Sequence, residues 1–193
     1  MPPMLGLRRC FLLPLTLVWF GIAVLPTLGR AQEGTDEDEP FLPGLIANYR
    51  DTQGHTTERL DYQMAFHWGE TPPDPRLTAG EFSVVWQGAL LVPTRGDYRF
   101  FIFGCGEMEL KIAGRVVIAQ QKVRKGWLSS SAVSLTADYH TLELAFRRTE
   151  KDARLMFLWS GPDFELEPVP ARFLYHPRQK SVARDFERGR LLA

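Results

Sequence analysis

Apolar and polar residues alternate in short runs between residues 44 and 176, and this period of two limits the fold more than any other feature of the sequence. The alternation is clearest at 82–90, 98–102 and 142–146. A period of two places apolar side chains on one face of a β-strand, where they can be buried. The same stretch holds no amphipathic pattern long enough for a helix of three turns. The sequence therefore predicts an all-β domain over residues 44–176, an antiparallel β-sandwich or barrel-like fold.

The remaining strands and turns follow from the same pattern. We expect strands at 45–49, 108–112, 116–119, 132–135, 155–159 and 172–175, with turns at 93–96, 113–114, 126 and 161–162. The proline-rich segment 71–75 is expected to be a loop or a strand edge, because proline cannot donate a hydrogen bond to a neighbouring strand. Four strand-face aromatic residues are expected in the core, namely Trp86, Phe100, Phe146 and Trp159.

The N-terminal residues have the layout of a secretory signal peptide. Arg8 and Arg9 precede an uncharged stretch from residue 10 to residue 29, and Gly29 and Ala31 are the small residues of a cleavage site before Gln32. The alternative is an uncleaved anchor, since about 20 apolar residues span a bilayer. Both interpretations place the domain outside the cytoplasm: secreted, periplasmic, at the cell surface, or anchored by residues 1–31. Contact with a membrane is expected only through an uncleaved N-terminal segment.

Charge and cysteine content argue against a nucleic-acid-binding protein and against a domain stabilised by disulfides. Lys and Arg total 23 against 23 Asp and Glu, so no basic field for binding nucleic acid is present. Without residues 1–31 the chain has 20 bases against 23 acids, a net charge of −3, and a single cysteine, Cys105. No intramolecular disulfide is then possible, and packing must stabilise the domain. Residues 32–43, with five acids and no base, are expected to be an acidic linker, and residues 177–193 a basic C-terminal tail.

Several short motifs follow one another in an order typical of one family. They are Gly44-Leu45-Ile46-Ala47-Asn48-Tyr49, Trp86-Gln87-Gly88, Gly96-Asp97-Tyr98-Arg99-Phe100, Leu110-Lys111-Ile112-Ala113-Gly114, Leu155-Met156-Phe157-Leu158-Trp159 and Leu174-Tyr175. This succession resembles the PA-fourteen domain, a β-sandwich module named after anthrax protective antigen. The resemblance implies a non-enzymatic recognition module that binds ligands, often sugars, at one end of the sandwich. In that family two consecutive aspartates hold a calcium ion that engages glycan hydroxyls.

The sequence departs from the family pattern at the ligand loop. Alignment on Gly96 and Gly114 puts Cys105-Gly106-Glu107 where Asp-Asp-Gly is expected, and Ala113 where the hairpin aspartate is expected. The candidate ligand-binding residues are therefore Gly104, Cys105, Gly106, Glu107 and Ala113 of an altered loop. Residues 104–106 are expected to form a tight loop, with a buried thiol as the plainer interpretation. Cysteine is a soft ligand unsuited to calcium, so no calcium site and no other cofactor or metal is expected.

No set of catalytic residues is visible in the sequence. The four histidines lack metal-binding spacing, and Ser129-Ser130-Ser131 lies outside a nucleophile elbow, so we expect no enzyme activity. Two functions stay open. The first is recognition of carbohydrate or another cell-envelope polymer, probed by a glycan screen with and without calcium. The alternative is a structural or protein-interaction domain that binds another exported protein and has lost the sugar site.

Overall fold

The computed structural model describes residues 40–178, which form strands and one short 3-10 helix. The predicted residues 1–31 and nearly all of the predicted tail lie outside the described residues, as does the linker up to residue 39. No helix in the described range is long and apolar enough to cross a membrane. The elements are β1 (Phe41–Pro43), β2 (Leu45–Asp51), β3 (Thr56–Asp61), β4 (Ala65–Gly69), β5 (Phe82–Leu91), β6 (Gly96–Ile112), β7 (Arg115–Ser129), β8 (Val133–Leu135), β9 (Tyr139–Arg147), β10 (Ala153–Gly161), β11 (Phe164–Pro168), η1 (Ala171–Phe173) and β12 (Leu174–Pro177).

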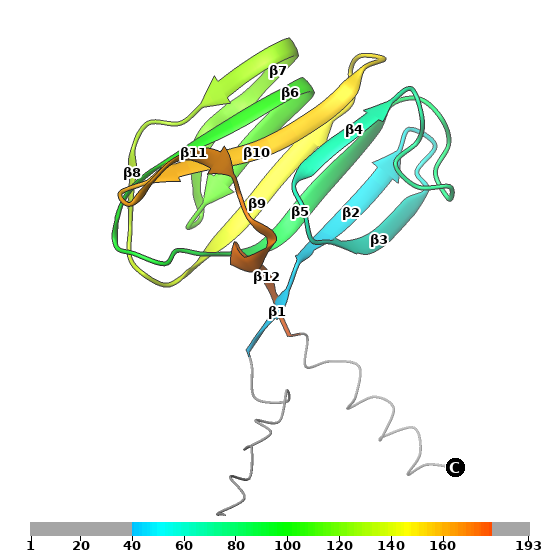
Figure 1. Ribbon diagram of the computed structural model, residues 1–193. Helices are drawn as coiled ribbons and strands as arrows, with labels where there is room; N and C mark the ends of the chain where they lie inside the picture. Colours follow the sequence, from blue (N-terminus) through cyan, green and yellow to red (C-terminus); the bar gives the residue numbers. More distant parts are fainter. Residues whose placement is uncertain (1–39, 179–193) are drawn as a thin grey trace, which may run out of the picture. The chain divides into compact units, whose positions relative to one another are not determined.

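All strand pairs are antiparallel, and the 12-stranded sheet folds over into two layers (Figure 1). In the first layer β5 pairs with β9, and β9 pairs with residues 107–112 of β6. β2 and β12 share the other edge of β5. In the second layer residues 99–105 of β6 pair with β10, whose other edge is shared by β4 and β11. The long hairpin of β6 and β7 therefore belongs to both layers, and the predicted antiparallel all-β fold is confirmed.

Two predicted turns are wrong, because both lie inside strands. Residues 104–106 belong to β6 and Gly126 to β7, and Gly104 is the cross-strand partner of Gly126. These glycines lie where the hairpin bends and its backbones approach closely. Glycine marks such places in sheets as well as turns. The sheet also begins at Phe41, three residues before the expected boundary at Gly44, because β1 pairs with β12. The predicted loop at 71–75 is confirmed, since those residues form no strand.

The core between the layers is built from the inward-facing residues of each strand. The four predicted core aromatics are buried, and Trp86 and Trp159 have 0% exposure. Trp86 packs against Phe66 with ring centroids 5.2 Å apart, and its Nε1 donates a 2.8 Å hydrogen bond to Asp61 Oδ2. The Tyr49 hydroxyl donates to the same oxygen at 2.7 Å. Burial, reinforced by Asp61, raises the pKa of Tyr49, so its hydroxyl stays a donor in the interior.

Replacing Trp86 or Trp159 with alanine should lower the free energy of unfolding by about 3–5 kcal/mol, because each change leaves a cavity in the core. Trp86→Ala also removes a hydrogen bond to the buried Asp61. Val116→Ala is the control, since Val116 is 53% exposed and its loss should cost less than about 0.5 kcal/mol. Urea unfolding measures all three. Losses under about 1 kcal/mol for the tryptophan variants would contradict the core assignment.

Candidate functional site

The predicted ligand loop is a bend within β6. Cys105 is paired with Arg154 of β10, whereas Glu107 is paired with Arg147 of β9, so the strand changes layers between them. The register between β6 and β7 shifts between Gly104 and Gly106, which is a β-bulge. Gly106 has a φ of +148°, and a Cβ on it would lie 2.5 Å from a Phe146 ring carbon. Glycine at 106 is therefore a requirement of the bend.

The five predicted residues do not gather in one place. Cys105 is only 3% exposed, and burial, followed by the charges of Asp152 and Glu150, raises the pKa of its thiol. Ala113 is exposed in the β6–β7 turn with a φ of +51°. It is six residues from Glu107 along the strand, which is about 20 Å at roughly 3.3 Å per residue. Gly104 and Gly106 are buried backbone positions. Glu107 alone presents a polar side chain to a surface hollow.

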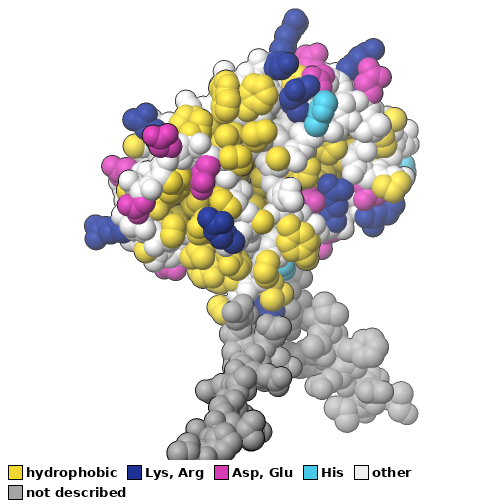
Figure 2. Space-filling model, in the orientation of Figure 1, with side chains coloured by type: hydrophobic (Ala, Val, Ile, Leu, Met, Phe, Trp, Pro, Cys, Tyr) yellow, Lys and Arg dark blue, Asp and Glu magenta, His cyan; other side chains and the backbone are white. Residues whose placement is uncertain are grey.

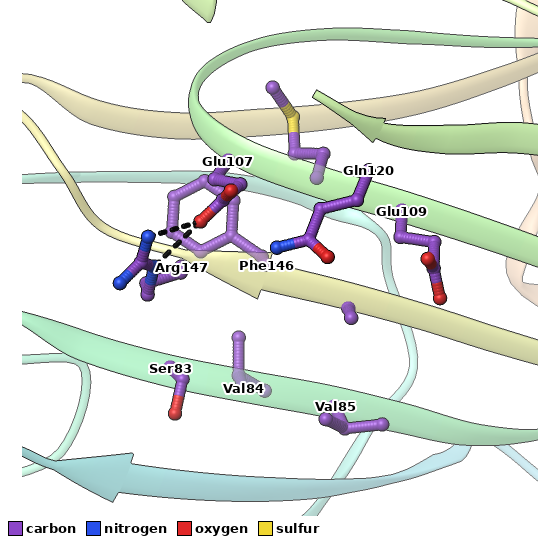
Figure 3. A pocket seen from close by; sticks show the side chains of 10 residues that line it. Ser83, Val84, Val85, Glu107, Glu109, Gln120, Phe146 and Arg147 are labelled. Carbon is purple, nitrogen blue, oxygen red and sulfur yellow. Dashed lines mark hydrogen bonds and ion pairs between the residues drawn. The ribbon is translucent and has the colours of Figure 1, made fainter. Parts of the chain in front are cut away.

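Glu107 stands at the edge of a shallow hollow on the outer face of the first layer (Figure 3). The hollow has a volume of about 170 Å³. Small or short side chains from β5 and β9 form its floor, and polar side chains from β6, β7 and β9 surround them. We call it the Glu107 hollow, and its outward-facing members are Ser83, Val85, Glu107, Glu109, Gln120, Ala145 and Arg147.

The Glu107 carboxylate is held in place by Arg147, with Gln120 nearby in the hollow. Arg147 Nε donates a 2.7 Å hydrogen bond to Glu107 Oε2, and both residues are partners across β6 and β9. Hydrogen bonds from Arg147 and then Gln120 lower the pKa of Glu107, so the carboxylate is ionised at neutral pH. The hollow thus presents a carboxylate, a guanidinium and an amide side by side. These planar groups can together accept and donate hydrogen bonds to neighbouring hydroxyls.

The polar surface continues along the same strands beyond the hollow. Lys111 Nζ lies 3.1 Å from Glu109 and donates a 2.9 Å hydrogen bond to Glu143 Oε1, and Gln87 donates to the other oxygen of Glu143 at 3.0 Å. A second depression of about 240 Å³ is lined by Gln87, Lys111 and Glu143. The outer face of β5, β9 and β6 is therefore an elongated polar surface rather than a single closed pocket.

The residues at the bend do not fit a calcium ion. Calcium in proteins takes six to eight oxygen ligands, several from carboxylates. Cys105 is buried with a protonated thiol, Gly106 has no side chain, and Glu107 is engaged by Arg147. Within residues 40–178 no three His, Cys, Asp or Glu side chains are placed to share a metal. Ala113 adds no ligand oxygen from its side chain.

Arg147 and Gln120 are the site residues that the sequence did not indicate. Arg147 is 40 residues from Glu107, and only the pairing of β6 with β9 brings the two together. The alternation at 142–146 does place residue 147 on the outward face, which is the one signal in the sequence. Nothing in the sequence indicates which strand lies beside β9.

Comparison with known proteins identifies one domain family. The family model described as PA14 domain matches residues 42–171. The chain is 24% identical over 135 residues to the anti-sigma-I factor RsgI3 of Acetivibrio thermocellus, covering 69% of this chain but 21% of that protein. A solved anti-sigma factor domain-containing protein from Clostridium clariflavum is 26% identical with a TM-score of 0.62, over 70% of this chain and 48% of that chain. The chain thus spans about half or less of these relatives.

Structures of lower identity share the fold. The Epithelial Adhesin 9 A domain of Candida glabrata, solved in complex with Galb1-4GlcNAc, matches with a TM-score of 0.58 at 12% identity, over 74% of this chain and 93% of that domain. A PA14 sugar-binding domain from an RTX adhesin matches with a TM-score of 0.55 at 13% identity. The match covers 70% of this chain and 99% of that domain. At these identities the likeness shows the sandwich architecture.

Gly106→Ala should destabilise the domain more than Gly114→Ala. Both glycines have positive φ, which costs an alanine about 1–2 kcal/mol. A Cβ at 106 also meets Phe146 and the Arg147 carbonyl, whereas one at 114 meets nothing within 4 Å. Overpacking adds about 1–3 kcal/mol at position 106. We therefore expect the free energy of unfolding to fall by roughly 2–5 kcal/mol in Gly106→Ala and by about 1–2 kcal/mol in Gly114→Ala. Equal losses in urea unfolding would show that the bend does not depend on Gly106.

Calcium should leave the thermal stability of the chain unchanged. We expect equal melting temperatures in 1 mM calcium chloride and in EDTA, because the bend lacks a set of oxygen ligands. A site with a Kd near 10 μM would instead add about 2.7 kcal/mol at that concentration. Differential scanning fluorimetry measures the difference. A stabilisation of this size that is abolished by Glu107→Ala would mean that the family's calcium chemistry survives here.

Proposed function

The chain belongs to the PA14 domain family, as its order of motifs predicted, and on this premise we propose that it is an exported, non-enzymatic module that recognises glycan without calcium. The Glu107 hollow is the proposed site. The observation that carries the proposal is the hydrogen-bonded ion pair of Glu107 and Arg147, with Gln120 nearby, on an open polar surface. Export rests on residues 1–31, outside the described residues, and stays a prediction.

The proposed recognition uses hydrogen bonds to adjacent sugar hydroxyls. One hydroxyl donates to Glu107 and its neighbour accepts from Arg147, which Glu107 already holds before a ligand arrives, or from the nearby Gln120. Such preorganisation reduces the entropy lost on binding. The hollow is shallow and open to water, however, so each hydrogen bond replaces one to solvent and contributes only about 0.5–1.5 kcal/mol. We therefore expect weak binding, with Kd of about 0.1–1 mM for a single site.

Two features of the comparisons support a carbohydrate or cell-envelope polymer as the partner. Structural neighbours include a domain named as sugar-binding and a domain solved with a galactose-containing disaccharide. The curated relative is an anti-sigma factor of which this chain matches 21%, so the relative's regulatory activity is not transferred to this chain. The alternative function, binding another exported protein, is favoured by one observation, the absence of the aspartate pair at 105–106.

Glycan binding should depend on Glu107. A glycan array, followed by affinity electrophoresis in gels containing the polysaccharides that bind, should show retention of the full chain in EDTA as well as in calcium. Glu107→Gln removes the charge that Arg147 contacts and should weaken binding at the hollow about tenfold, since a charged hydrogen bond contributes roughly 1.5–3 kcal/mol. Arg124→Gln, an exposed arginine outside the hollow, is the matched control. Absence of any glycan binding would refute the proposed function and favour the protein partner.

A further inference from the structure

A row of apolar side chains crosses the outer face of the second layer. Phe103 of β6 is the cross-strand partner of both Trp127 of β7 and Met156 of β10, and Met156 is paired in turn with Ala65 of β4. Neighbouring strands are about 4.8 Å apart, so these side chains form one continuous row across four strands. Figure 2 shows apolar side chains gathered over the face that β10 crosses in Figure 1. We call this row and the hollow beside it the aromatic groove.

The Trp127 ring is largely exposed. It is 55% exposed, in contrast to Trp86 and Trp159 in the core. Its ring centroid lies 5.0 Å from that of Phe103, with the two planes inclined by 51°. The adjoining hollow has a volume of about 270 Å³, and its outward-facing lining residues include His67, Phe103 and Met156. Exposed aromatic rings beside a hollow are a common feature of binding sites, because they bury a large area with little loss of conformational freedom.

Polar side chains occupy one wall of the groove and balance one another in charge. Arg154 Nη2 donates a 2.6 Å hydrogen bond to Asp152 Oδ2, and His67 Nε2 lies 2.9 Å from Asp152 Oδ1. Hydrogen bonds with Arg154 and then His67 lower the pKa of Asp152, which is therefore ionised. Both Arg154 and His67 line the hollow. The Arg154 guanidinium and the Asp152 carboxylate balance one another in charge, so this wall offers hydrogen-bonding groups within an ion pair.

We propose that the aromatic groove is a second glycan-binding site, separate from the Glu107 hollow, which takes a neutral sugar ring of a soluble polysaccharide. This inference rests on the proposed function of glycan recognition and adds a second site and a ligand class. The C–H face of one pyranose ring packs on Trp127 and that of the next ring on Phe103, while hydroxyls of the sugar chain reach the polar wall. The Arg154 guanidinium is already paired with the Asp152 carboxylate, so it is not free to pair with a uronate, which favours a neutral ring.

The geometry also distinguishes the kind of polysaccharide. Two rings inclined by 51° cannot both lie flat on one plane, so they do not match the surface of a crystalline polymer. The two aromatic rings match a single polysaccharide chain whose successive sugar rings are turned relative to one another. A protein partner fits less well, since a stable protein interface usually buries about 800 Å² on each side, whereas this groove is small and bounded by charged side chains.

The test measures binding of the full chain to soluble neutral polysaccharides and to a polyuronate. Affinity electrophoresis is run with mixed-linkage β-glucan, xyloglucan, galactomannan and polygalacturonate, and tryptophan fluorescence is followed during titration. We expect at least one neutral polysaccharide to shift the emission and to lose about tenfold in affinity with Trp127→Ala. Trp127→Phe should restore part of the affinity, because it keeps an aromatic ring. Leu166→Ala is the matched control, a 49% exposed side chain on β11 outside the groove.

The variants separate the second site from the first. Loss of affinity in Trp127→Ala, with Glu107→Gln still binding through the groove, supports the inference. Glycan binding that Trp127→Ala leaves unchanged and Glu107→Gln abolishes would overturn it while the proposed function stands. Trp127-dependent binding of polygalacturonate alone would overturn the neutral-ring assignment. Absence of all polysaccharide binding, in a chain whose circular dichroism shows the β-fold, would refute both proposals.

Discussion

The bend at Gly104–Gly106 is the constraint on which the two-layer arrangement depends. β6 must pair with β10 before the bend and with β9 after it, and the strand can change layers only where its backbone approaches its neighbours closely. A Cβ at Gly104 would lie 2.8 Å from the Arg154 carbonyl oxygen, and one at Gly106 the same distance from that of Arg147. Glycine removes both collisions. The residues flanking the bend, Phe103 and Glu107, are consequently presented on the outer faces of different layers.

The core contains large aromatic residues whose polar atoms need hydrogen-bond partners when they are buried. An indole N–H without a partner in the interior costs about 1–3 kcal/mol. Asp61 accepts from both Trp86 and Tyr49, and Arg59 balances its charge with a 2.8 Å contact to the other oxygen. This group ties β2, β3 and β5 together at one end of the first layer.

The sequence predicted the features that a local residue pattern determines. It missed the features that depend on which strands pair with one another. Alternation at 82–90 and 142–146 reports burial directly, so the all-β fold and the core position of Trp86 followed from it. Glycines at 104 and 106 are consistent with either a turn or a bulge, and only the partner strands decide between them. Glu107 came from the family resemblance, whereas Arg147 and Trp127 reach their sites through contacts 40 and 24 residues away in the chain.

The proposed recognition without calcium has a physical consequence for the kind of ligand. A calcium ion concentrates strong attraction at one point, and a chain that lacks it must rely on several weak contacts. The proposed sites on either side of the bend are each shallow, but their strands belong to one continuous sheet. When a single polymer reaches both, the second contact forms at a high effective concentration, and the combined affinity exceeds that of either site. A free monosaccharide can fill only one site at a time, so the two proposed sites together would favour long or repeating glycans over their components.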